Sequence, residues 1–177
     1  MAGPRLNPTL FDKLITDSRI VSIVDETGEG SGASKAQAPT FYTVASLERF
    51  NETALRATVR RELAWLLNTT NLGAAQDLSP YPEVQTSVLN YGMPDLTGRA
   101  STVKAIRERS EQIRKAILVY EPRMEADKLQ VEARSTIEKD NAVTFLIRGD
   151  VTSAVKAMPV QFLADVEVET GEAVVRE

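Results

Sequence analysis

The tripeptide Glu121-Pro122-Arg123 places an acid and a base on either side of a rigid residue. Proline stops a helix and favours an extended conformation for the residue before it. In an extended segment, side chains two positions apart lie on the same face. We therefore expect Glu121 and Arg123 to form an adjacent pair of opposite charges. Such a pair suits recognition of a partner or bracing of a surface better than catalysis, although it could also be an incidental surface ion pair.

The chain has 177 residues, with 0 histidines and 0 cysteines. This excludes cysteine nucleophiles, serine–histidine–aspartate triads, histidine acid–base chemistry and ordinary zinc sites. An enzyme with this composition would depend on carboxylates, lysine, tyrosine or a metal held by oxygen ligands. We predict a protein that is not an enzyme, with no catalytic residue, no cofactor and no metal.

Two weaker patterns could still belong to a catalytic or ligand-binding site. Glu62 and Glu121 are acids near predicted helix ends, and glycoside hydrolysis uses two carboxyl groups across a cleft. Nothing in the sequence marks such a cleft, and we expect the single tryptophan, Trp65, in the core. The segment 28–35 superficially resembles a phosphate-binding loop, but such a loop needs glycine directly before its lysine, and Ser34 precedes Lys35.

Arginines on the predicted helices form the last candidate site. They could make a basic patch for an acidic partner, although charged helix faces are more often simply solvated. The five arginines are Arg56, Arg60, Arg61, Arg107 and Arg114.

The elements that position these residues follow from hydrophobic periodicity. An apolar stripe with steps of three and four predicts a helix that starts at Ser101 or Thr102 and ends at the tripeptide. Its members are Val103, Ile106, Ser110, Ile113 and Ile117. Another long helix is predicted over 44–67, with short helical stretches at 10–15 and 84–89, a turn at 91–95 and a flexible linker at 27–39.

After the tripeptide the period changes to two, which is typical of half-buried antiparallel strands. The predicted fold is α+β, with N-terminal helices packed on a mostly antiparallel C-terminal β-sheet. We expect an N-terminal helix and arm over 1–40 and one α+β domain over 41–177. Strands are predicted at 129–137, 143–147, 162–168 and 173–176, with turns at 138–141 and 170–171 and a loop at 149–159.

Composition is that of an ordinary soluble globular protein, with 42% apolar and 26% charged residues. The net charge of -4 argues against nonspecific nucleic-acid binding, which needs a basic surface. The apolar stretch at 116–120 is far short of the ~20 residues that span a bilayer. Residues 1–8 lack the apolar region of a secretory signal, so we expect a cytoplasmic protein that is not inserted in a membrane.

Several segments, taken in order, resemble the TssE-type baseplate subunit of bacterial type VI secretion systems. That family is related to the wedge protein of contractile-tail phage baseplates, and its lysozyme-like label is inherited from a phage name. The central loop and the tripeptide Glu121-Pro122-Arg123, in this order, are the most specific part of the match. The matching segments are 10–14, 55–68, 87–96, 121–123 and the turn at 170–171, whereas 27–39 departs from the family pattern.

The resemblance implies a structural protein that connects the baseplate wedge to the contractile sheath and nucleates sheath polymerisation. Its partners would be sheath subunits of the TssB and TssC type and wedge subunits of the TssF, TssG and TssK type. Residues 41–177 would form the wedge-like domain, in a baseplate docked at the inner face of the cytoplasmic membrane. The sheet would accept strands of the first sheath ring along an open edge.

In this interpretation Glu121 and Arg123 contact the sheath strands or hold the surface that does, and Pro122 fixes their geometry. Exposed acids such as Glu132 and Asp165 would discourage promiscuous edge pairing. The sequence leaves open which sheet edge accepts a strand. It also leaves two alternatives: a carboxylate-dependent hydrolase of cell-wall glycan, and a regulatory adaptor of the same fold that binds a different partner.

Overall fold

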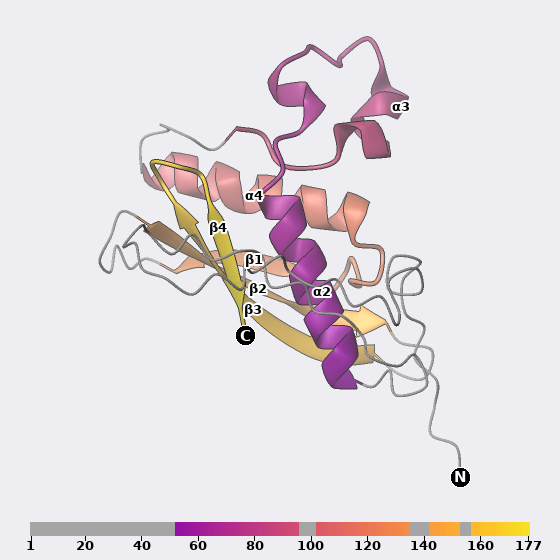
Figure 1. Ribbon diagram of the computed structural model, residues 1–177, viewed down its shortest axis with the longest axis vertical. Helices are drawn as coiled ribbons and strands as arrows, with labels where there is room; N and C mark the ends of the chain where they lie inside the picture. The colour runs from indigo at the N-terminus through magenta and orange to yellow at the C-terminus, as the bar shows by residue number, and fades with distance from the viewer. Residues whose placement is uncertain (1–51, 96–101, 135–141, 153–156) are drawn as a thin grey trace, which may run out of the picture.

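The computed structural model describes residues 52–95, 102–134, 142–152 and 157–177 (Figure 1). The predictions for the helical stretch at 10–15, the linker at 27–39, the turn at 138–141 and Ser101 lie outside these residues, as does the division of the chain at residue 40. So does the start of the predicted helix 44–67. Among the described residues, no helix combines the length and the apolar character needed to cross a membrane.

Two long helices are the first major elements, α2 (Glu52–Leu67) and α4 (Val103–Tyr120). Thr102 caps α4, since its side chain accepts a hydrogen bond from the amide of Ala105 at 3.2 Å. The helix ends where the tripeptide predicted, with Glu121 as its C-terminal cap and Pro122 beyond. Three short turns connect the helices: η2 (Leu72–Ala74), α3 (Pro82–Gln85) and η3 (Val88–Asn90).

The apolar stripe of α4 was predicted one turn too long. Ile113 and Ile117 are fully buried, but Val103 is 78% exposed. Helical side chains tilt towards the N-terminus, so that of the first residue points past the end of the helix rather than onto the sheet.

Four antiparallel strands form one sheet in the order β1-β2-β3-β4, namely β1 (Gln130–Arg134), β2 (Ala142–Thr152), β3 (Ala157–Glu167) and β4 (Ala173–Arg176). Both helices lie on one face, α4 against β1 and α2 against β4 (Figure 1). Alternate strand residues point to the helices and form the core with them; Phe145, Ile147 and Phe162 are fully buried there. The predicted α+β class and antiparallel sheet are confirmed.

The predicted loop at 149–159 is wrong, because β2 and β3 continue through most of it and Asp150 pairs with Pro159. Glycine and proline in this stretch usually interrupt strands. Here Gly149 allows close packing, since a Cβ at this position would lie 2.8 Å from the Cε of Met124. Pro159 is tolerated because β4 pairs with β3 only from Leu163 to Val166, so none of the described strands needs the missing N–H.

Candidate functional site

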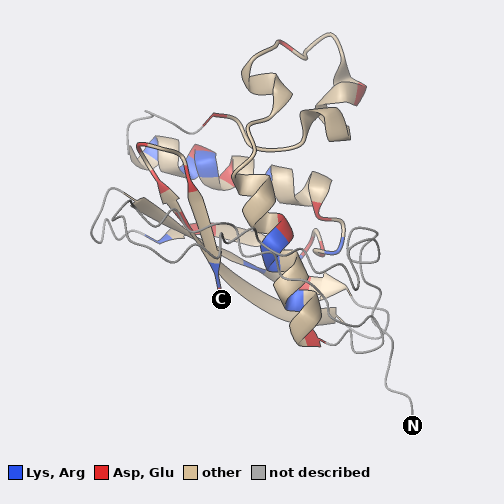
Figure 2. Cartoon of the chain, in the orientation of Figure 1, with Lys and Arg blue, Asp and Glu red and all other residues tan. Residues whose placement is uncertain are grey.

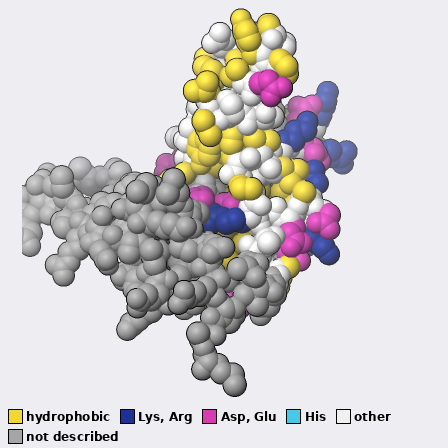
Figure 3. All heavy atoms as spheres, turned by 90° about the vertical axis from the view of Figure 1, so that its right-hand side faces the viewer, with side chains coloured by type: hydrophobic (Ala, Val, Ile, Leu, Met, Phe, Trp, Pro, Cys, Tyr) yellow, Lys and Arg dark blue, Asp and Glu magenta, His cyan; other side chains and the backbone are white. Residues whose placement is uncertain are grey.

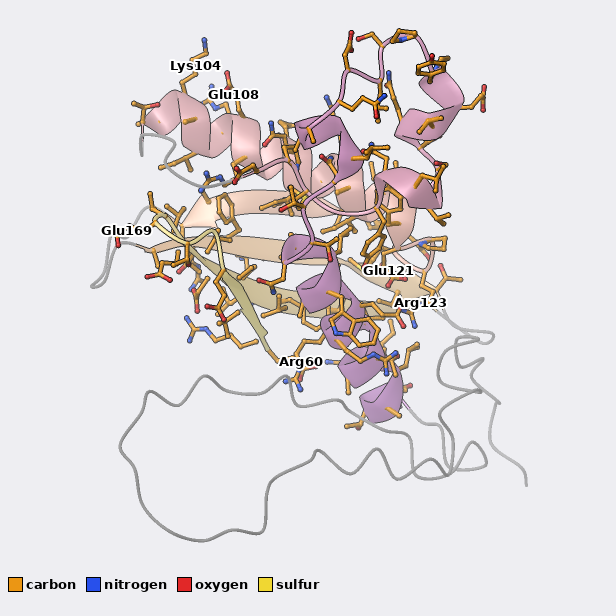
Figure 4. All side chains as sticks on the ribbon, turned by 45° about the horizontal axis from the view of Figure 1, so that its top comes forward. Arg60, Lys104, Glu108, Glu121, Arg123 and Glu169 are labelled. Atoms are coloured by element: carbon orange, nitrogen blue, oxygen red, sulfur yellow. The ribbon has the colours of Figure 1, made fainter. Side chains whose placement is uncertain are left out.

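The site is built around the side chain of Arg123. Its Nε lies 2.6 Å from Oε1 of Glu121, and its Nη2 lies 2.6 Å from Oε2 of the same carboxylate. This two-point contact is the strong, directional form of an arginine–carboxylate pair. Figure 4 shows the two side chains together against α2. The expected adjacent pair of opposite charges is therefore present.

Burial separates this pair from an incidental surface contact. Glu121 is only 3% exposed and the side chain of Arg123 is 16% exposed. Removing two charges from water costs several kcal/mol each, roughly, unless other groups compensate. The pair is consequently part of the packing between the helices and the sheet.

A second carboxylate, that of Glu62 on α2, helps to compensate for the removal of these charges from water. Its Oε2 accepts from Nη2 of Arg123 at 2.6 Å, and its Oε1 accepts from Nη2 of Arg61 at 2.9 Å. Thr58 lies one turn earlier, and its hydroxyl is 3.4 Å from Nη1 of Arg123. We call Glu62, Glu121, Arg61 and Arg123 the charge cluster; it contains two acids and two bases.

The cluster also changes the interpretation of the predicted basic patch. Arg61 is buried rather than on a solvated helix face, and its guanidinium lies 4.9 Å from the ring centre of Trp65. Trp65 is half-buried, so its predicted core position is confirmed only in part. Arg114 is also engaged internally, because it donates to the carbonyl oxygens of Leu129 and Ala126. The five arginines do not form one free patch.

Electrostatics follow from this geometry. Burial raises the pKa of Glu62, and the charge of Glu121 raises it further, while Arg123 and Arg61 oppose the shift. Burial also raises the pKa of Tyr91 to about 12, with smaller contributions from the two carboxylates. The hydroxyl of Tyr91 lies 3.5 Å from the backbone oxygen of Glu62, and its ring packs edge-on against Tyr120 at 5.2 Å.

Backbone hydrogen bonds tie the tripeptide to the sheet. The carbonyl of Arg123 accepts from the amide of Thr152 at 2.7 Å, and the amide of Glu125 donates to the carbonyl of Asp150 at 2.9 Å. Between them Met124 forms an antiparallel bridge with Val151. The segment after Pro122 thus pairs with the end of β2. It lies on the same side of β2 as β1, which pairs with an earlier part of that strand.

The cluster has the geometry of a brace between a helix and a sheet. Both carboxylates bind the same guanidinium, whereas glycoside hydrolysis requires two carboxyl groups that face a substrate across a cleft. Within the described ranges, no group of three acidic side chains is placed to hold a metal ion. The arrangement therefore gives the hydrolase alternative no support.

Helices packed on one face of an antiparallel sheet, joined by a buried ion-pair brace, define an α+β scaffold. A protein-family model described as "Baseplate wedge protein gp25" matches residues 53–155. The matched part runs from α2 through the tripeptide to β2 and covers more than half of the chain. This chain belongs to that baseplate wedge family, and its role is that of a structural protein in a phage-tail-like baseplate. The sequence-based assignment to the baseplate wedge family is thereby confirmed. No curated protein and no solved structure matches the chain.

Proposed function

We propose that this protein is a TssE-type baseplate subunit of a type VI secretion system, which connects the wedge to the contractile sheath and nucleates sheath polymerisation. The family match supports a baseplate role, and the ordered segments that resemble TssE support the narrower assignment. The proposed partners are sheath subunits of the TssB and TssC type and wedge subunits of the TssF, TssG and TssK type. The proposed place is the cytoplasmic side of the membrane.

The observation that carries the proposal is the outer edge of β1. Backbone groups along an antiparallel strand alternate between its two neighbours. The carbonyl of Asp150 and the amide of Thr152 both bond towards the side of β1, so even-numbered residues of β2 face that side. Even-numbered residues of β1 pair with them, as Glu132 does with Leu146. The backbone groups of Val131 and Ala133 therefore point outwards.

The opposite edge of the sheet is already engaged in part. By the same alternation, Ala173 of β4 points its backbone groups away from β3. The side-chain amide of Asn68 binds both of them, since Nδ2 donates to the carbonyl of Ala173 at 2.8 Å and Oδ1 accepts from its amide at 2.9 Å. An incoming strand would have to displace Asn68 there, which favours the edge of β1 as the docking edge.

The proposed partner-binding role of Glu121, Pro122 and Arg123 is then that of a support. Their burial favours bracing over direct contact with a sheath strand. The segment that follows them is bonded to β2 in line with β1, so the charge cluster, which ties Arg123 to Glu62 of α2, fixes the end of the docking edge.

Sheath assembly with proline variants tests this proposal. Ala133→Pro removes an outward N–H without removing a bond to β2, and proline is accepted on such edge positions. We expect Ala133→Pro to stop sheath polymerisation while the circular dichroism spectrum and the thermal midpoint stay near those of the wild type. The matched control, Val175→Pro, removes the equivalent outward N–H on β4 and should leave polymerisation intact. Normal sheaths with a folded Ala133→Pro protein would refute the docking edge.

Co-purification separates the TssE-type role from the adaptor alternative. Sheath and wedge subunits should be recovered with the wild-type protein if the proposal holds. Recovery of unrelated proteins, with neither sheath nor wedge subunits present, would favour the adaptor.

A further inference from the structure

A separate surface lies on the segment between the two long helices. We call residues 71–91, which include η2, α3 and η3, the lobe; it projects beyond the helices in Figure 1. Its two ends are joined at a neck, where the amide of Met93 donates to the carbonyl of Thr69 at 2.7 Å and the amide of Asn71 donates to the carbonyl of Met93 at 2.9 Å. Gly92 is required there, since its φ is +119° and a Cβ would lie 2.2 Å from that oxygen of Thr69.

Side-chain amides hold the lobe in one conformation. Asn90 accepts from the amide of Gly73 at 2.8 Å and donates to the carbonyl of Gln85 at 2.9 Å. The side chain of Gln85 donates to the carbonyl of Leu78 at 3.0 Å, and Asn71 caps η2. The hydroxyl of Tyr120, at the end of α4, donates to the carbonyl of Asn90 at 2.7 Å and so fixes the lobe to the rest of the protein.

This ordered lobe turns apolar side chains outwards. Val88 is 83% exposed and Leu89 is 70% exposed; Tyr81 and Leu72 are also exposed, while Leu78 is buried. Figure 3 shows apolar side chains over the projecting part of the molecule. Contiguous exposed apolar patches on ordered backbone mark interaction sites, and a rigid surface loses little entropy on binding.

The charge of the lobe indicates what would bind it. The stretch 62–95 contains no lysine or arginine, whereas Asp77 and Glu83 are both exposed. Hydrogen bonds from the hydroxyl and the amide of Ser79 lower the pKa of Asp77, which keeps this carboxylate charged. Anionic phosphates of nucleic acid or lipid headgroups would be repelled. Two copies of the lobe face to face would oppose like charges, because a two-fold interface pairs a patch with itself.

We propose that the lobe is a docking surface for a helical segment of another protein, with an apolar face flanked by lysine or arginine. The exposed side chains of Val88 and Leu89 on η3, with Tyr81 directly before α3, would enter that face. Asp77 and Glu83 would pair with its cations. This surface is separate from the edge of β1, so the inference goes beyond the proposed sheath contact and does not depend on it.

Site-specific photo-crosslinking in the native host tests the proposal on the full-length protein. A photoreactive phenylalanine analogue is placed at position 88, or at position 103 as the matched control, since Val103 is similarly exposed but lies on α4. The cross-linked peptides are identified by mass spectrometry. We expect position 88 to trap a segment of another protein that carries apolar residues and lysine or arginine at helical spacing, and position 103 not to trap it. Products that contain a second copy of this chain, residues 1–51 of the same chain, or a segment without lysine or arginine would overturn the proposal, as would no product.

Two substitutions then test the apolar part and the acidic part of the lobe surface, with the photoreactive analogue placed at position 81. Leu89→Asp should lower the cross-linking yield at least about 10-fold, the size of effect expected for a central apolar contact. Glu83→Lys should lower the yield through charge repulsion, whereas Val103→Asp should not change it. Folding of every variant is checked by circular dichroism. An unchanged yield in folded Leu89→Asp protein would also overturn the proposal.

Discussion

Arg123 organises the candidate site at the scale of single residues, because one guanidinium binds the carboxylates of Glu121 and Glu62. The sequence predicts the first contact, since proline fixes two neighbours on one face. It gives no signal for the second, because Glu62 is 61 residues away and lies within a helix rich in charged residues. A local rule cannot identify a partner that only packing brings close.

Arg123→Met should lower the free energy of unfolding by about 3–5 kcal/mol at neutral pH, because it leaves two partly buried acids with less compensation. Urea denaturation measures the change. Arg107→Met, which removes an exposed arginine of α4, is the matched control and should change stability by less than about 0.5 kcal/mol. A loss below about 1 kcal/mol in Arg123→Met would show that the cluster is not a brace.

The same variant has a predicted pH dependence. A carboxyl whose pKa is raised in the folded protein favours folding at low pH, and this contribution is lost as the pH rises through the folded pKa. Arg123 holds down the raised pKa of Glu62, so Arg123→Met should raise that pKa further. The stability deficit of the variant should therefore shrink as the pH is lowered from 7 towards 4.5. A constant deficit would mean that Glu62 does not respond to Arg123.

At the scale of elements, hydrophobic period identifies most of the fold. The N-cap at Thr102, the end of α4 before Pro122 and the final strand 173–176 are all confirmed. The loop predicted at 149–159 is wrong because Gly149 is accommodated by close packing against Met124, and Pro159 breaks a strand only where the ladder needs its missing N–H. Whether it does depends on the length of β4, which no local pattern in β3 encodes.

Asn68 joins two elements, since its side chain ends α2 and closes the edge of β4. It donates to the carbonyl of Ala64 at 2.8 Å as well as binding Ala173. Asn68→Ala should cost about 1–3 kcal/mol, because each of these hydrogen bonds contributes roughly 0.5–1.5 kcal/mol. Thr69→Ala removes only a local bond to the carbonyl of Trp65 and is the matched control.

Hydrogen exchange gives the local readout of this change. The amide of Ala173 should exchange faster in Asn68→Ala, while amides at the centre of β2 and β3 change much less. Equal protection of Ala173 in both proteins would show that the edge of β4 is closed by something other than Asn68.

At the scale of the whole molecule, one scaffold carries the two proposed docking surfaces: the edge of β1 and the apolar lobe. For this region the sequence predicts a helical stretch at 84–89 and a turn at 91–95. The structure has two separate short helices there, α3 and η3, rather than one helical stretch. The sequence does not predict that Val88 and Leu89 face outwards, since a short apolar run has the same pattern whether it is buried or exposed. The tyrosine pair Tyr91 and Tyr120 joins the lobe to the end of α4, directly before Glu121.

Tyr120→Phe tests whether the lobe and the rest of the protein act as one unit. The change removes the hydroxyl that binds the carbonyl of Asn90 at 2.7 Å but keeps the ring that packs on Tyr91. Overall stability should fall by only about 1 kcal/mol, whereas hydrogen exchange of the lobe amides Gly73 and Ala74 should accelerate several-fold. Tyr91→Phe removes a hydroxyl that is 3.5 Å from its nearest backbone acceptor and should change this exchange little. If the lobe amides exchange equally in both variants and in the wild type, the neck alone holds the lobe. Force from a bound partner would then reach the sheet through Thr69 and Met93 rather than through α4.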